Sequence, residues 1–106
     1  MRTTVLVGKL QAMVDGREPY DEGAVLGIAL LITACFGADR EMRRMRVELL
    51  AEMGSLQSAR ADPQQSEHVA GNRARAQSAL MQLEAALRIQ HAPHSQTRSR
   101  SARHMP

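Results

Sequence analysis

Histidine and cysteine are the side chains of this sequence best suited to hold a metal ion or to attack a substrate. His91 and His94 are separated by two residues in the segment HAPH, Cys35 lies in an oily stretch, and His104 is near the C-terminus. A structural zinc site needs about four ligands that converge on one point, and the HAPH spacing supplies only two. We therefore expect no metal site and no cofactor.

Short catalytic motifs are missing from the sequence. It contains no nucleophile elbow, no glycine-rich phosphate loop and no HExxH pattern, which are the arrangements that position nucleophiles, phosphates or zinc. Between residues 40 and 52 glutamates are interleaved with arginines, and Arg44 and Glu48 are one helical turn apart, a spacing typical of a solvated, self-paired helix surface. We predict that the protein is not an enzyme.

The basic residues are concentrated at the C-terminal end of the chain. The formal net charge is +3, and four of the fourteen Lys and Arg residues follow Glu84, the last acidic residue. The run RSRSAR could attract phosphates, but such contacts are salt-sensitive and no aromatic side chain is near to stack on bases. We expect no direct binding of nucleic acid. Residues 92–106 lack an apolar period and are predicted to form a flexible basic tail after a helical domain over residues 1–91.

The stretch GAVLGIALLITACFGADREMRRMR, Gly23 to Arg46, changes abruptly from apolar to highly charged. Its apolar part, 16 residues from Gly23 to Ala38, is shorter than the roughly 20 residues that span a bilayer, so we expect no membrane insertion. The tetrapeptide ITAC before Phe36 resembles a bacterial lipobox, which leaves open a lipoprotein processed at Cys35. Acidic residues stand where a secretion signal should be positively charged. With its single cysteine the chain can form no internal disulfide, which suits a reducing compartment, and we expect a cytoplasmic protein.

Apolar spacing predicts an all-α fold in one domain. A short helix is expected over residues 3–14, followed by the turn DGREPYDEG, in which Asp21 is placed to cap the next helix. The segment 24–53 contains no proline and is predicted to be a single helix of about 30 residues, roughly 45 Å long. A loop over residues 54–67 then leads to a last helix, capped by Ser66 and running to about residue 90. We expect the two long helices to form an antiparallel hairpin.

The two long helices carry heptad-like apolar stripes that we assign to hairpin and dimer packing. The assigned residues are Ile28, Leu31, Cys35, Phe36, Leu80, Leu83 and Leu87. The first half of the predicted long helix is apolar on its other sides as well, and one neighbouring helix cannot cover all of them. We therefore predict a homodimer that forms a helical bundle.

The order of these elements resembles a known group of regulators. A short helix, an acidic Gly/Pro turn, a long helix with a charged second half and a closing helix are carried by LQAMVDGREPYDEGAV, ADREMRRMRVELLAEM and SALMQLEAALRIQ. In this order the chain is similar to the TraM/QslA-type antiactivators of bacterial quorum sensing. The resemblance implies binding to a LuxR-type, LasR-like transcription activator and steric inhibition of its dimerisation or of its binding to promoter DNA.

For partner binding we predict an apolar edge formed by the first helix and the turn after it. The predicted residues are Leu6, Leu10, Met13, Val14 and Tyr20. An alternative function is a small helical scaffold or chaperone that buries an amphipathic helix of another protein, since an apolar helical surface would serve either role.

Overall fold

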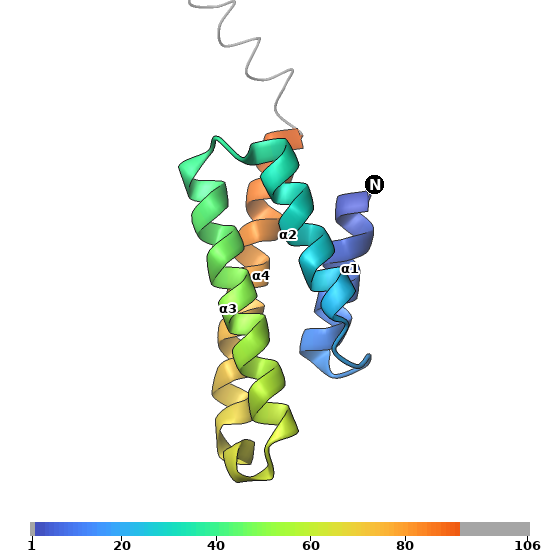
Figure 1. Ribbon diagram of the computed structural model, residues 1–106, viewed down its shortest axis with the longest axis vertical. Helices are drawn as coiled ribbons and strands as arrows, with labels where there is room; N and C mark the ends of the chain where they lie inside the picture. Colours follow the sequence, from blue (N-terminus) through green and yellow to red (C-terminus); the bar gives the residue numbers. More distant parts are fainter. Residues whose placement is uncertain (1, 92–106) are drawn as a thin grey trace, which may run out of the picture.

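The computed structural model describes residues 2–91, in which every regular element is helical. The elements are α1 (Arg2–Asp15), α2 (Glu22–Phe36), α3 (Arg40–Ala61), a short 3-10 helix η1 (Pro63–His68) and α4 (Val69–His91). Successive α-helices run in opposite directions (Figure 1). The all-α class expected from the sequence is confirmed, and the predicted tail over residues 92–106 lies outside the described part of the chain.

The four α-helices form a ring. α3 packs against α2 and α4, and α1 packs against α2 and α4, so each helix has two principal neighbours. α3 and α4 lie side by side and extend past the ends of α1 and α2 at the η1 end of the molecule (Figure 1). α1 is therefore one of the four helices that surround the core.

The predicted single helix over residues 24–53 is wrong, because the chain turns at residues 37–39 between α2 and α3. The Asp39 carboxylate accepts a hydrogen bond from the Met42 amide at 3.1 Å and so caps the start of α3. At Gly37 a Cβ would come within 2.6 Å of the Thr33 carbonyl oxygen, so the backbone approach at this turn requires glycine. The rod is thus folded into two antiparallel helices.

The predicted loop over residues 54–67 is also largely helical. α3 continues through Gly54 to Ala61 because Met53 and Leu56, which flank the glycine, are buried in the core. The chain turns at Asp62, whose carboxylate accepts a hydrogen bond from the Gln64 amide at 2.9 Å. Ser66 lies inside η1 and does not cap α4 as predicted.

The core is one apolar cluster to which all four α-helices contribute. Its buried members are Val7, Leu10, Met13, Val14, Val25, Ile28, Ile32, Met42, Leu49, Met53, Leu56, Ala76, Ala79, Leu80, Leu83 and Leu87. Two alanines of α4 belong to the cluster, and small side chains allow helices to approach closely. The four α-helices therefore share one common core.

Residues assigned to the hairpin and dimer stripes fall into three groups. Ile28, Leu80, Leu83 and Leu87 are buried in the core, and Leu31 and Phe36 are partly buried. Cys35 is exposed, so it does not pack in the core of the single chain, and its assignment to dimer packing stays a prediction. It lies in the last turn of α2, which extends past the start of α1 (Figure 1), and α1 gives it no cover.

Candidate functional site

The predicted partner-binding edge is mostly part of the core. Leu10 and Val14 are 0% exposed and Met13 is 2% exposed, while Leu6 and Tyr20 are partly buried. Leu10, Met13 and Val14 are therefore core residues, and their assignment to partner binding is wrong for the single chain. The reason is that α1 packs in the ring between α2 and α4, so its apolar stripe faces the chain's own helices.

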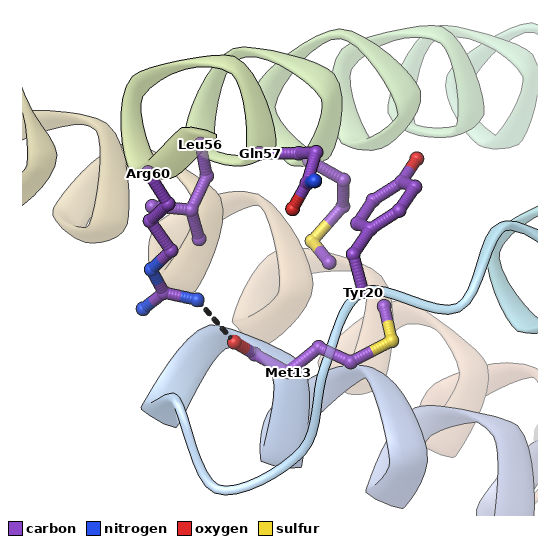
Figure 2. Close-up of a pocket in the computed structure, with 6 residues that line it drawn as sticks. Met13, Tyr20, Leu56, Gln57 and Arg60 are labelled. Atoms are coloured by element: carbon purple, nitrogen blue, oxygen red, sulfur yellow. Dashed lines mark hydrogen bonds between the residues drawn. The ribbon is translucent and has the colours of Figure 1, made fainter. Parts of the chain in front are cut away.

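A small cavity lies between α3 and the turn that joins α1 to α2 (Figure 2). It is lined by Met13, Tyr20, Met53, Leu56, Gln57 and Arg60, and its volume is about 10 Å³. This is about the space that one water needs. The cavity is therefore a packing gap and is too small for an organic ligand. Among its lining residues, the partly buried Tyr20 has a phenol whose pKa is raised by burial, and the nearby Glu22 carboxylate adds to this rise.

Arg60 closes this cavity by capping the end of α1. Its guanidinium donates to the carbonyl oxygen of Met13 at 2.5 Å (Figure 2) and to that of Val14 at 2.7 Å. Carbonyls in the last turn of a helix have no partner within the helix, and a cation also complements the negative helix end. The Arg60 side chain thus has a structural role, joining α3 to α1.

Backbone bonds complete the end of α1. Gly16 has a φ of 81°, which is the left-handed conformation that glycine adopts without strain. The Arg17 amide donates to the Ala12 carbonyl at 2.9 Å and the Gly16 amide to the Met13 carbonyl at 3.1 Å, as in a Schellman motif. The sequence Asp15-Gly16, expected to mark a turn, ends the helix in this way.

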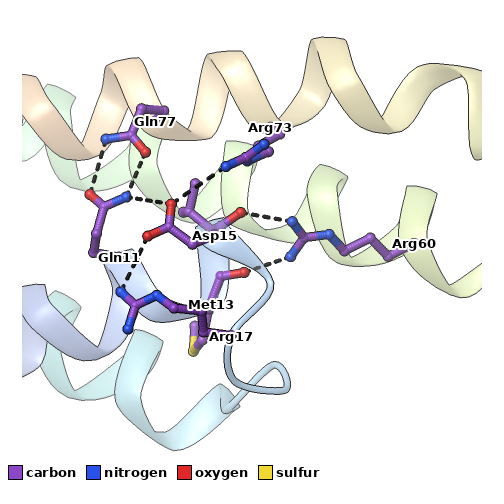
Figure 3. A network of polar contacts seen from close by, with 8 residues as sticks. Gln11, Met13, Asp15, Arg17, Arg60, Arg73 and Gln77 are labelled. Atoms are coloured by element: carbon purple, nitrogen blue, oxygen red, sulfur yellow. Dashed lines mark hydrogen bonds and ion pairs between the residues drawn. The ribbon is translucent and has the colours of Figure 1, made fainter.

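A polar network ties α1 to α4 (Figure 3). The side-chain amides of Gln11 and Gln77 exchange hydrogen bonds of 2.6 and 3.0 Å. Asp15 accepts a hydrogen bond from Gln11 at 3.0 Å and forms ion pairs with Arg17 at 3.2 Å and Arg73 at 3.6 Å. The Gln11 hydrogen bond, followed by the Arg17 contact, lowers the pKa of the Asp15 carboxyl. These polar groups are engaged in holding the helices together.

The outward side of α2 carries a row of exposed apolar side chains. Leu26 is 50% exposed, Leu30 is 69% exposed, and Ala34 is also exposed. Residues four apart lie on one side of a helix, so these three form a continuous strip, which we call the α2 face. No charged residue occurs between Glu22 and Asp39, and the strip is therefore uncharged along its length.

The α1 side of this strip is also apolar. Gly27 lies against α1, where a Cβ would be 3.7 Å from the Leu6 side chain. The preceding residue of α1, Val5, is 68% exposed. The α2 face thus adjoins a helix that offers a further apolar side chain at its surface.

The sequence analysis predicted the α2 face in part. It predicted that the apolar half of the long helix packs against other helices on several sides, and Leu26 and Leu30 belong to that half. Spacing alone did not separate them from Ile28 and Ile32, which are 0% and 1% exposed, because all four residues are aliphatic and fall within two helical turns. Which side faces the core depends on where α1 and α3 pack.

No helix in residues 2–91 combines the length and apolar character needed to cross a membrane. Within the same described residues, no group of three or more His, Cys, Asp or Glu side chains could hold a metal ion. Comparison of the chain with models of protein families, with curated proteins and with solved structures finds no match.

Proposed function

We propose that this protein is a quorum-sensing antiactivator that binds a LuxR-type, LasR-like transcription activator and prevents its dimerisation or its binding to promoter DNA. The observation that carries the proposal is the α2 face, an uncharged helical strip with two largely exposed leucines. The choice of partner rests on the resemblance of the sequence segments to the TraM/QslA-type antiactivators, in which the long helix expected over residues 24–53 is replaced here by α2 and α3. The mechanism is steric, since a helix bound to the receptor covers a surface that the receptor needs.

The apolar strip suits protein binding on energetic grounds. Complete burial of a leucine side chain contributes about 1.5–3 kcal/mol, and Leu26 and Leu30 retain half or more of their exposure in the folded chain. Removing both from water supplies a central hot spot of the kind found in protein interfaces. Because both residues already lie on a regular helix, little ordering entropy opposes their binding.

A homodimer through the same face is the second part of the proposal. A two-fold axis places one surface patch against its own copy, and the α2 face has no charge that would oppose this. In such a dimer α3 and α4 serve as the antiparallel hairpin that supports α1 and α2. Receptor and second copy then compete for Leu26 and Leu30, so receptor binding should separate the dimer.

The decisive experiment compares a double arginine variant with a single arginine control and uses light scattering to measure complexes with a purified LuxR-type receptor. Leu26→Arg combined with Leu30→Arg should abolish both the complex and the dimer, because an arginine cannot be buried there without a partner. The matched control is Met81→Arg on α4, where the native side chain is 57% exposed but belongs to another side of the ring. Both variants should keep the wild-type helicity by circular dichroism.

Retention of receptor binding by the Leu26/Leu30 variant would show that the α2 face is not the binding surface. Wild-type protein that ignores LuxR-type receptors but binds an isolated amphipathic helix of a secreted protein would favour the scaffold or chaperone alternative. The lipoprotein alternative is tested by the intact mass of membrane-extracted protein. Cleavage before Cys35 would remove α1 and nearly all of α2, including the core residues Leu10 and Ile28, which makes it the least compatible with this fold.

A further inference from the structure

The start of α3 presents a second exposed surface, which differs in charge from the α2 face. Arg40 and Arg43 are exposed, and Val47, one turn further on, is 58% exposed. Together with Arg44 and Glu48 they line a shallow hollow on the surface of α3. We call Arg40, Arg43 and Val47 the arginine edge. It belongs to the helix that packs beside α2.

The carboxylates nearest to this edge are already engaged. Glu41 and Glu48 both bind Arg44, at 2.8 and 3.0 Å, and Asp39 caps the Met42 amide. Within residues 2–91, no ion pair reaches Arg40 or Arg43. The edge therefore combines two cations that have no counter-charge in the fold with one exposed aliphatic side chain.

From this arrangement we infer that the arginine edge binds an acidic helical segment of the partner, with carboxylates opposite Arg40 and Arg43 and an apolar side chain over Val47. The inference rests on the proposed function in that the partner is the LuxR-type receptor. In a dimer through this edge, Arg40 and Arg43 of one copy would face the same two arginines of the other copy, and this charge repulsion is unfavourable. The edge thus distinguishes receptor from second copy, whereas the α2 face accepts both.

Phosphate is the other anion that two arginines can attract. Glu41 and Glu48 lie on the same surface of α3. A nucleic acid would bring a continuous row of phosphates close to these two carboxylates, which repel it. A helical peptide can instead place one carboxylate opposite each arginine and none opposite the two glutamates. The carboxylate partner also supplies the apolar side chain that Val47 requires. The acidic peptide is therefore the better match, and a short DNA duplex serves as a competing probe in the test.

The test uses a synthetic amphipathic peptide of about four helical turns with Leu on one side and Glu along one flank, and an otherwise identical peptide with Gln in place of Glu. Each is titrated into the isotopically labelled full chain, and amide shifts are followed by NMR at low and high salt. We expect the Glu peptide to shift the amides of residues 40–47 and to bind about tenfold more tightly than the Gln peptide, with the difference reduced by salt.

Charge reversal identifies the residues responsible. Arg40→Glu with Arg43→Glu should remove the preference for the Glu peptide and should slow receptor association. The control Arg88→Glu alters an exposed arginine of α4 and should keep the preference. Equal affinity for the two peptides, wild-type behaviour of the Arg40/Arg43 variant, or tighter binding of the DNA duplex than of the Glu peptide at this edge would each overturn the inference.

The two proposals fail separately. If the wild-type protein binds no LuxR-type receptor but prefers the Glu peptide through Arg40 and Arg43, the proposed function is refuted and the inferred binding of an acidic partner still stands. If the receptor binds equally well with and without the two arginines, the inference is refuted and the antiactivator proposal still stands.

Discussion

Asp15 shows how single side chains fasten the helices of this protein to one another. Its carboxylate receives a hydrogen bond from Gln11 in the same helix and ion pairs from Arg17 and Arg73. Asp21 caps α2 through the Ala24 amide at 3.2 Å and pairs with Lys9 at 3.3 Å. The pKa of both carboxyl groups is lowered, by the Gln11 hydrogen bond first for Asp15 and by the Ala24 amide first for Asp21.

These lowered pKa values predict a loss of stability in acid. A carboxyl group whose pKa is lower in the folded state stabilises that state at pH values above its unfolded pKa, about 3.9 for Asp. This stabilisation disappears as the pH falls through the folded pKa. Urea unfolding measured from neutral pH down to about pH 3 should therefore show falling stability below about pH 4. Asp15→Asn should flatten that fall, and curves that remain parallel in this range would contradict the assignment.

Single residues also explain why the binding site was predicted less well than the fold. The helical spacing of Leu10, Met13 and Val14 was read correctly, and those side chains were assigned to a partner although they belong to the core. An apolar stripe on a helix indicates only that another surface packs against it. Whether the cover is the same chain or another molecule depends on tertiary packing, which spacing does not contain.

Helix boundaries in this chain are decided by caps more than by propensity. Gly37 lies within the segment that was predicted to be one helix, yet the close approach at Gly37 and the Asp39 cap together end α2 and start α3. Gly54, equally weak by propensity, lies within α3 because Met53 and Leu56 hold the helix against the core. Local sequence therefore predicted the helical class of each segment better than its ends.

Glycine-to-alanine substitutions at these two positions should have opposite effects. Gly37→Ala places a Cβ within 2.6 Å of the Thr33 carbonyl oxygen, so the turn must shift, and we expect a loss of about 1–3 kcal/mol in the free energy of unfolding. Gly54→Ala meets nothing within 4 Å and should gain about 0.5–1 kcal/mol, because alanine favours the helix and restricts the unfolded chain. Thermal unfolding of the two variants measures the contrast, and changes of the same sign would contradict it.

At the scale of the whole molecule, folding and binding use different sides of the same helix. α2 turns Val25, Ile28 and Ile32 toward the ring interior and leaves Leu26 and Leu30 outside. The prediction that this helix carries more apolar surface than a simple two-helix hairpin can hide led to a proposed dimer. Part of that apolar surface is covered by α1, the helix whose apolar residues were predicted to bind a partner.

Two leucine substitutions separate these roles. Leu83→Ala removes a side chain that is 0% exposed and should cost about 2–5 kcal/mol of stability, from lost burial and the cavity left behind. Leu30→Ala alters a side chain that is 69% exposed and should change the stability of a single chain by no more than about 0.5 kcal/mol. Urea unfolding at low protein concentration provides the comparison. A large loss for Leu30→Ala under those conditions would mean that this leucine supports the fold itself.

The exposed thiol of Cys35 makes the α2 face observable in the unaltered protein. It is the single cysteine of the chain and follows Ala34, the last residue of that strip. One maleimide dye would therefore label one known position next to Ala34, at the end of the α2 face, and its fluorescence would report the arrival of any occupant in real time. The native sequence thus carries its own attachment point for a spectroscopic reporter.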